Sequence, residues 1–143
     1  MHFRSLFVFS VFAVLWGACG GGENGESAPN GISPDTLAVW MEDGRTITLL
    51  DTQPDSVFDA EHLPGAIRAY GLRIPDLREV LPRDPGVPIV VYNSDGASPP
   101  AGQDLARQAV GYGFSEVYWL DGGVKSWKGR GYNVDGFRLF PRP

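Results

Sequence analysis

The residues of this chain that could do chemistry are one thiol and one polar loop, and they lie far apart. Cys19 is the only cysteine among 143 residues, and its thiolate would be a strong nucleophile. The loop has the sequence Asn-Ser-Asp-Gly-Ala-Ser over residues 93–98. A serine acts as a nucleophile only beside a base, and the only histidine besides His2 is His62. The loop therefore carries polar groups without an evident catalytic pair.

Cys19 closes an N-terminal segment with the form of a secretory signal. A weakly positive start precedes an apolar run over residues 6–16 and two small residues directly before the cysteine. The apolar run is shorter than the roughly 20 residues that span a bilayer. The segment resembles the lipobox of bacterial lipoproteins, in which the cysteine is acylated and becomes the first mature residue. We predict a signal peptide over residues 1–18, with an ordinary signal peptide or an uncleaved anchor as alternatives.

Composition then divides the remainder of the chain. Residues 19–34 are rich in Gly, Asn, Ser and Pro and bury too little apolar surface to fold, so they are predicted to be a flexible linker. Residues 35–143 are long enough for one domain with its own core. We predict that this domain includes a short C-terminal extension beyond the last regular element.

The net charge of the chain limits the classes of partner that it could bind. The chain has 12 basic and 17 acidic residues; loss of Arg4 with the signal leaves 11 against 17, a net charge of −6. Without a basic cluster, nucleic acid is excluded as a partner, and membrane affinity has to come from the lipid. The acidic residues between Asp51 and Glu61 do not have the spacing of a Ca²⁺ loop. We expect neither a metal nor a cofactor.

The domain alternates helical and strand patterns. Helical segments are predicted from Ser33–Pro34, with Ser33 as the cap, and over 56–61, 75–81, 101–110 and 122–128. Strands are predicted over 47–50, 66–69, 87–92 and 116–120, and the continuous apolar run of 87–92 indicates burial on both faces. This order predicts a parallel sheet, of about five strands, with helices on both faces.

Ligands of such sheets bind beyond the carboxyl ends of the strands. Two predicted strands lead directly into polar residues there: Asp51–Thr52–Gln53 follow one, and Asn93–Ser94–Asp95–Gly96 follow the other. The loop after residue 92 is therefore the default candidate site.

Three motifs carry a family resemblance. Asp51, then Gln53, then His-Leu-Pro-Gly-Ala over 62–66 resembles the N-terminal signature of rhodanese-like domains, which usually has Arg where Gln53 stands. Residues 87–96 resemble the family's active-loop strand, and residues 112–134 resemble its C-terminal signature, including Gly122, Gly123 and Trp127. The resemblance spans roughly residues 32–134 and implies a single α/β rhodanese-like domain.

The resemblance also implies what sulfur transfer would require. In this family a loop cysteine attacks sulfane sulfur and carries it as a persulfide, inward-pointing amides stabilise the anion, and a basic residue near the end of the loop helps to bind the donor. Asn93 stands at the cysteine position and Ser98 at the basic position, while Asp95 adds negative charge and Pro99–Pro100 lack N–H donors. We therefore expect no enzyme activity.

The sequence hypothesis is a lipid-anchored inactive sulfurtransferase homologue in the cell envelope, facing the periplasm or exterior. Its role would be binding or scaffolding of a protein partner or a small polar ligand. The alternatives are a sulfurtransferase-related enzyme and a small-anion receptor, either of which would use the loop. Gly20 after the cysteine favours the outer membrane by resemblance to diderm sorting. This hypothesis assigns three sets of residues. Cys19 is the lipid attachment site, and Asn93, Ser94, Asp95, Gly96, Ala97 and Ser98 form a degenerate active-site loop and possible ligand site. The motif residues with a structural role are Asp51, His62, Gly65, Gly122, Gly123 and Trp127.

Overall fold

The computed structural model describes residues 29–96 and 100–136. Five parallel strands form one sheet in the order β1-β5-β4-β2-β3. The strands are β1 (Asn30–Ile32), β2 (Thr48–Asp51), β3 (Ile67–Arg68), β4 (Ile89–Tyr92) and β5 (Val117–Leu120). Between and after them lie α1 (Pro34–Glu42), α2 (Asp55–Ala60), the 3₁₀ helix η1 (Ile74–Leu77), α3 (Pro100–Gly111) and α4 (Gly123–Gly129). The predicted single α/β domain with five parallel strands is confirmed.

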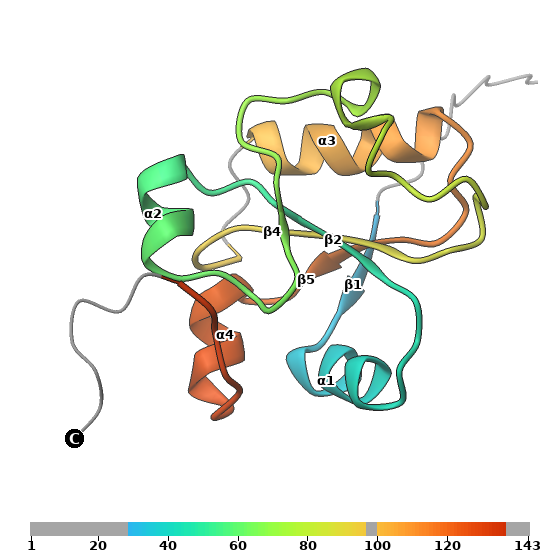
Figure 1. Cartoon of the computed structure of the whole chain (residues 1–143). Helices are drawn as coiled ribbons and strands as arrows, with labels where there is room; N and C mark the ends of the chain where they lie inside the picture. Colours follow the sequence, from blue (N-terminus) through green and yellow to red (C-terminus); the bar gives the residue numbers. More distant parts are fainter. Residues whose placement is uncertain (1–28, 97–99, 137–143) are drawn as a thin grey trace, which may run out of the picture.

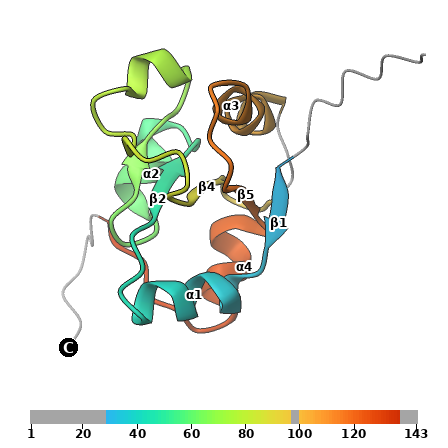
Figure 2. The same cartoon turned by 90° about the vertical axis from the view of Figure 1, so that its right-hand side faces the viewer.

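Helices cover both faces of this sheet, as the alternating pattern predicted. Figures 1 and 2 show α3 and the chain around η1 (residues 70–84, called here the η1 segment) on one face, and α1 and α4 on the other. All four residues of β4 are buried, because this central strand is covered on both sides. Its alternate residues therefore serve two cores: Val91 belongs to the core under α3, and Tyr92 to the core over α1 and α4.

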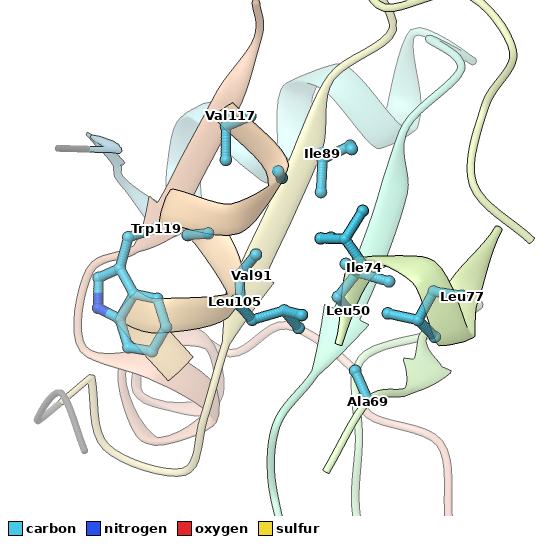
Figure 3. Packing of buried hydrophobic residues seen from close by; sticks show 11 residues of the cluster. Leu50, Ala69, Ile74, Leu77, Ile89, Val91, Leu105, Val117 and Trp119 are labelled. Carbon is cyan, nitrogen blue, oxygen red and sulfur yellow. The ribbon is translucent and has the colours of Figure 1, made fainter. Parts of the chain in front are cut away.

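The core under α3 joins the 3₁₀ helix to the sheet. Ile74 and Leu77 of η1 are buried against Leu50 of β2 and Leu105 of α3, and Figure 3 shows these side chains converging. The sequence predicts a helical segment over residues 75–81, but the regular helix is shorter and tighter, over residues 74–77. Two buried apolar residues one 3₁₀ turn apart, Ile74 and Leu77, fix it against the sheet.

The start of the domain is also earlier than predicted. Residues 30–32 lie within the predicted linker, yet they pair with residues 118–120 of β5 and form an edge strand. Ile32 supplies the buried apolar group, and Ser33 caps α1 as predicted, its Oγ accepting the Thr36 N–H at 3.1 Å. The linker prediction is therefore wrong for residues 30–34, and residues 19–28 of it lie outside the described residues.

The predicted signal peptide and Cys19 also lie outside the described residues. Within residues 29–96 and 100–136, no helix has the length and apolar character needed to cross a bilayer.

Candidate functional site

The candidate site lies where β2 and β4 end. These neighbouring parallel strands pair through Asp51 and Tyr92, so the residues that follow them come to the same edge of the sheet. Thr52 fixes the two chain exits together: its N–H and its Oγ1 both donate to the Tyr92 carbonyl at 2.9 Å. Asn93, the next residue, is 7% exposed. The loop after β4 and helix α2 lie on the same side of the molecule (Figure 1).

A buried carboxylate supports this edge. Asp51 is fully buried and accepts the Gln53 N–H at 2.7 Å and the Gln53 Nε2 at 2.8 Å. The Tyr92 hydroxyl also donates to Asp51 while accepting the Leu63 N–H at 3.0 Å. Burial raises the pKa of the Asp51 carboxyl, and these hydrogen bonds oppose the rise. Burial and the Asp51 charge likewise raise the pKa of the Tyr92 hydroxyl.

Gln53 connects this carboxylate to the loop. Its Nε2 donates to Asp51 and to the Glu61 carbonyl, the latter at 3.2 Å. Its Oε1 accepts the Ser94 hydroxyl at 2.7 Å. An arginine has donors but no acceptor, so this bond from Ser94 requires a residue such as glutamine. The departure from the family signature at position 53 therefore matches the serine at position 94.

Asn93 uses its side chain to close the loop on itself. Its Oδ1 accepts the Gly96 N–H at 2.7 Å, an Asx-type turn in which a side-chain oxygen takes a loop amide. Gly96 has φ +67°, a conformation that glycine adopts readily. The amide that an incoming anion would use at this point already has an acceptor within the chain.

The first turn of α4 is also committed to the loop. The N–H groups of Val124 and Lys125 donate to the carbonyls of Asn93 and Ser94, at 3.0 and 2.7 Å. This contact requires glycine at the start of the helix, because a Cβ on Gly123 would lie 2.3 Å from the Asn93 carbonyl oxygen. A Cβ on Gly96 would lie 2.3 Å from the Gly122 nitrogen. Gly123 of the C-terminal signature and Gly96 of the loop thus let the loop and the helix meet backbone to backbone.

These contacts define what the described part of the loop can do. Ser94 donates its proton to an amide oxygen, which is not a general base. His62 directs Nδ1 to the Phe58 carbonyl at 2.7 Å, stacks on the Phe58 ring and bridges to Asp135. No serine–histidine pair therefore forms among the described residues. Across the same described ranges, no three His, Cys, Asp or Glu side chains come together in a way that could hold a metal ion.

The other residues singled out from the sequence lie around this core or outside the described chain. Gly65 has φ +77° in the turn before β3. Trp127 is buried in α4, and its Nε1 donates to the Asn133 carbonyl at 2.8 Å. Asp95 is exposed. Ala97 and Ser98 lie outside the described residues. The sequence reasoning missed Tyr92, whose hydroxyl joins Asp51 to Leu63. A polar tip on an otherwise buried strand was the available signal.

Comparison with known proteins agrees with this architecture. The family model described as "Rhodanese-like domain" matches residues 33–130. The chain is 28% identical over 97 residues to the thiosulfate sulfurtransferase GlpE of Pseudomonas syringae, covering 68% of this chain and 85% of the relative. It is 30% identical over 93 residues to thiosulfate sulfurtransferase GlpE of Coxiella burnetii, covering 64% and 82% of the two chains.

Solved structures give the same fold. The BH2092 protein of Bacillus halodurans matches with a TM-score of 0.65 at 22% identity, covering 79% of this chain and 85% of that one. The rhodanese-like domain of the Alr3790 protein of Anabaena matches with a TM-score of 0.63 at 23% identity, over 79% and 85%. The family model, the sequence relatives and the sheet order together establish that this chain belongs to the rhodanese-like domain family.

Proposed function

We propose that this chain is a rhodanese-like domain that does not transfer sulfur and acts as a binding or scaffolding module, held at a membrane by a lipid on Cys19. The observation that carries the non-catalytic part is Asn93, which stands after β4 where the family resemblance places a cysteine. Its amide has no thiolate to offer, and its Oδ1 is occupied by the Gly96 N–H. The relatives named thiosulfate sulfurtransferases share the fold, and the proposal separates this chain from their activity.

The electrostatics of the loop support the same proposal. A sulfur donor such as thiosulfate is an anion, and Asp95 presents a carboxylate on the described part of the loop. Charges about 4 Å apart repel by about 4 kcal/mol at an effective dielectric constant of 20, and by less when exposed to solvent and salt. The two α4 amides nearest the loop already donate to its carbonyls. These contacts favour neither a small-anion receptor nor a hydrolase that uses Ser94.

A thiosulfate–cyanide assay tests the missing activity. The full chain in detergent should form thiocyanate no faster than buffer, and Cys19→Ser should leave this result unchanged. Asn93→Cys is the matched gain-of-function variant, because it restores a thiol at the loop position, and GlpE of Pseudomonas syringae serves as the positive control. Turnover in the native chain that survives Cys19→Ser and disappears in Asn93→Ala would overturn the proposal.

The anchor needs a separate test. A short basic start, an apolar run and small residues before Cys19 support lipoprotein processing, and the Gly-rich segment after it would hold the domain near a membrane surface. Two or more acyl chains anchor stably, whereas one is marginal. Intact-mass analysis should find residues 1–18 removed and an acylated Cys19, and Cys19→Ser should release the protein from the membrane fraction. An unmodified Cys19 in membrane-bound protein would contradict the anchor.

The compartment follows from the anchor in this proposal. The domain would face the periplasm or exterior of the cell envelope, and Gly20 after Cys19 favours the outer membrane in a cell that has one. Fractionation of inner and outer membranes tests this assignment. Sedimentation with the inner membrane would limit the proposal to that membrane, and recovery in the cytoplasm would contradict it.

A further inference from the structure

Most of the large apolar side chains that the structure describes as exposed belong to two segments that pack together, the chain around η1 and the residue after α3. Of the five large apolar residues that the structure describes as exposed, only Val39 lies elsewhere. Three of the other four, Tyr70, Leu72 and Val80, belong to the η1 segment, and the fourth, Tyr112, directly follows α3. Tyr112 is 62% exposed. Single exposed apolar residues are ordinary, whereas a gathering of them marks a contact surface.

Figure 2 shows the η1 segment and α3 next to each other on one face of the sheet. Two hollows lie between these segments. The first has a volume of about 190 Å³ and is lined by Tyr70, Leu72, Arg73 and Gln108 among others. The second has a volume of about 270 Å³ and is lined by Ile74, Leu81, Phe114 and Tyr112 together with two arginines. Gln108 lines the first hollow and Ile74 the second, and the Gln108 Oε1 accepts the Ile74 N–H at 3.3 Å. We call the two hollows together the α3 groove.

Two residues that line the hollows, Gln108 and Tyr112, are spaced like alternate side chains of an extended peptide. Gln108 lines the first hollow and Tyr112 the second, and residues four apart on an α-helix are separated by about 6 Å along its axis. Alternate side chains on one face of an extended chain repeat every 6.6–6.8 Å or so. Two side chains separated by one residue can therefore enter the two hollows at once. Each hollow is below the volume of a drug-sized site, as expected for a pocket that takes one side chain.

Charge selects the peptide. The second hollow is lined by Arg78 and Arg83 and by no carboxylate. The first is lined by Arg73 and by Asp104, whose carboxylate accepts the Gln108 Nε2 at 2.9 Å. Arg78 pairs with the adjacent Glu79 at 3.2 Å, and both side chains are exposed. Arg83 forms no ion pair with any residue that the structure describes. Asp76 and Asp84 lie on the same segment but bond to Arg73 and to the Gly86 N–H. A free guanidinium beside an apolar floor selects a carboxylate next to an apolar side chain.

We propose that the α3 groove binds an extended, acidic segment of a partner protein. This segment has two apolar side chains with one residue between them, and a carboxylate that lies beside Arg83. Tyr and Arg are residue types that dominate binding energy in protein interfaces. The proposal deepens the binding role proposed above and rests on it. None of residues 93–96 lines either hollow, but Thr52, which bonds to the Tyr92 carbonyl at the candidate site, lines the first one.

An NMR titration of the ¹⁵N-labelled full chain in micelles tests this site. The probe is the peptide acetyl-Glu-Phe-Glu-Leu-Glu-amide, whose Phe and Leu are one residue apart. We expect saturable shifts confined to the amides of the α3 groove, including Arg83, Gln108, Tyr112 and Phe114. We test two control peptides, one with Gln in place of each Glu and one with Ala in place of Phe and Leu. Each should bind at least about tenfold more weakly, because the first lacks the carboxylates and the second lacks the apolar side chains.

Matched variants separate the groove from general charge attraction. Arg83→Gln should weaken the acidic peptide about tenfold, whereas Arg107→Gln removes the same charge from α3 outside the hollow linings and should change affinity less than twofold. Tyr112→Ser should weaken binding, with Val39→Ser as the exposed apolar control. Absence of saturable shifts, equal binding of the Gln peptide, or equal losses in Arg83→Gln and Arg107→Gln would overturn the proposal. Concentration-dependent shifts at the groove without peptide would assign it to a second copy and also overturn it. None of these outcomes alters the sulfur-transfer assay, so the two proposals fail separately.

Discussion

The loop after β4 and the α3 groove differ in where their polar groups are directed. In the loop, Asn93 and Ser94 bond inward to Gly96, Gln53 and the first turn of α4. In the groove, Arg83 has no ionic partner among the described residues and Tyr112 projects its ring to solvent. Hydrogen bonds already made within the chain cost free energy to exchange for a ligand. The described side chains after β4 are therefore engaged in hydrogen bonds within the chain, whereas the proposed binding surface lies between the η1 segment and α3.

This comparison predicts that substitutions around the loop lower the free energy of unfolding, and that Gly123→Ala lowers it most. Its Cβ would lie 2.3 Å from the Asn93 carbonyl oxygen, at a residue with φ +54°. We expect a loss of about 3 kcal/mol or more in the free energy of unfolding, measured by urea denaturation. Gly129→Ala is the control in the same helix: nothing lies within 4 Å of its Cβ, and better helix propensity should make it neutral or slightly stabilising. Equal effects of the two substitutions would show that α4 does not depend on close contact with the loop.

Gln53→Met should cost less, about 2 kcal/mol. The substitution keeps the length of the side chain but removes the donor to Asp51 and Glu61 and the acceptor for Ser94. Buried polar groups that lose a partner bear most of this cost. Gln103→Met on α3 provides the control, because the Gln103 Oε1 accepts a hydrogen bond from the exposed Arg107 side chain. It should change the free energy of unfolding by less than about 0.5 kcal/mol. A Gln53→Met protein as stable as the native chain would break the proposed link between Asp51 and the loop.

Asp51 should make the free energy of unfolding depend on pH, because its carboxyl has a raised pKa in the folded state. Burial raises the pKa of its carboxyl, so the folded state holds this proton to higher pH than the unfolded state, whose value is near 3.9. The free energy of unfolding attributable to Asp51 therefore falls as pH rises from about 4 through the raised folded value. Urea titrations at several pH values should show native-minus-Asp51→Asn stability decreasing across this window. A difference that grows with pH would mean that hydrogen bonding outweighs burial.

The groove should show the smallest effect on stability. Arg83→Gln and Tyr112→Ser remove exposed groups, and each should change the free energy of unfolding by less than about 0.5 kcal/mol. Thermal unfolding provides the measurement. A loss comparable to that of Gln53→Met would mean that these side chains support the fold, and the contrast between loop and groove would fail.

Sequence reasoning reached most of the fold because its signals were local. Ser33–Pro34 predicts the start of α1 through a cap and a fixed proline φ, and the apolar run ending at Tyr92 predicts a strand covered on both faces. β1 was missed because only Ile32 of its three residues is apolar, and pairing along one edge of β5 leaves no periodic pattern. The sequence pattern predicted too long a helix at residues 75–81, because the tertiary packing of Ile74 and Leu77 determines the extent of the 3₁₀ helix.

The candidate site was predictable in position and less so in contacts. The polar residues after β2 and β4 indicated the sheet edge on their own. The bond from Ser94 to Gln53 joins residues 41 positions apart, and no local pattern reports which side-chain atoms meet at such a distance. Gly122 and Gly123 were identified as motif positions, whereas their close backbone approach to Gly96 and Asn93 depends on how α4 docks. The α3 groove was not predicted, because it forms only when the η1 segment and α3 pack together.

The central claim is that the loop carries no sulfur, and a single-turnover labelling experiment tests it most directly. The native chain and Cys19→Ser would be incubated with thiosulfate that bears a radioactive outer sulfur, separated from free label, and digested for peptide mapping. The account predicts no label on the peptide that contains residues 93–96 in either protein, and label at that peptide in Asn93→Cys. Label retained there by Cys19→Ser, with Asn93 intact, would contradict the account.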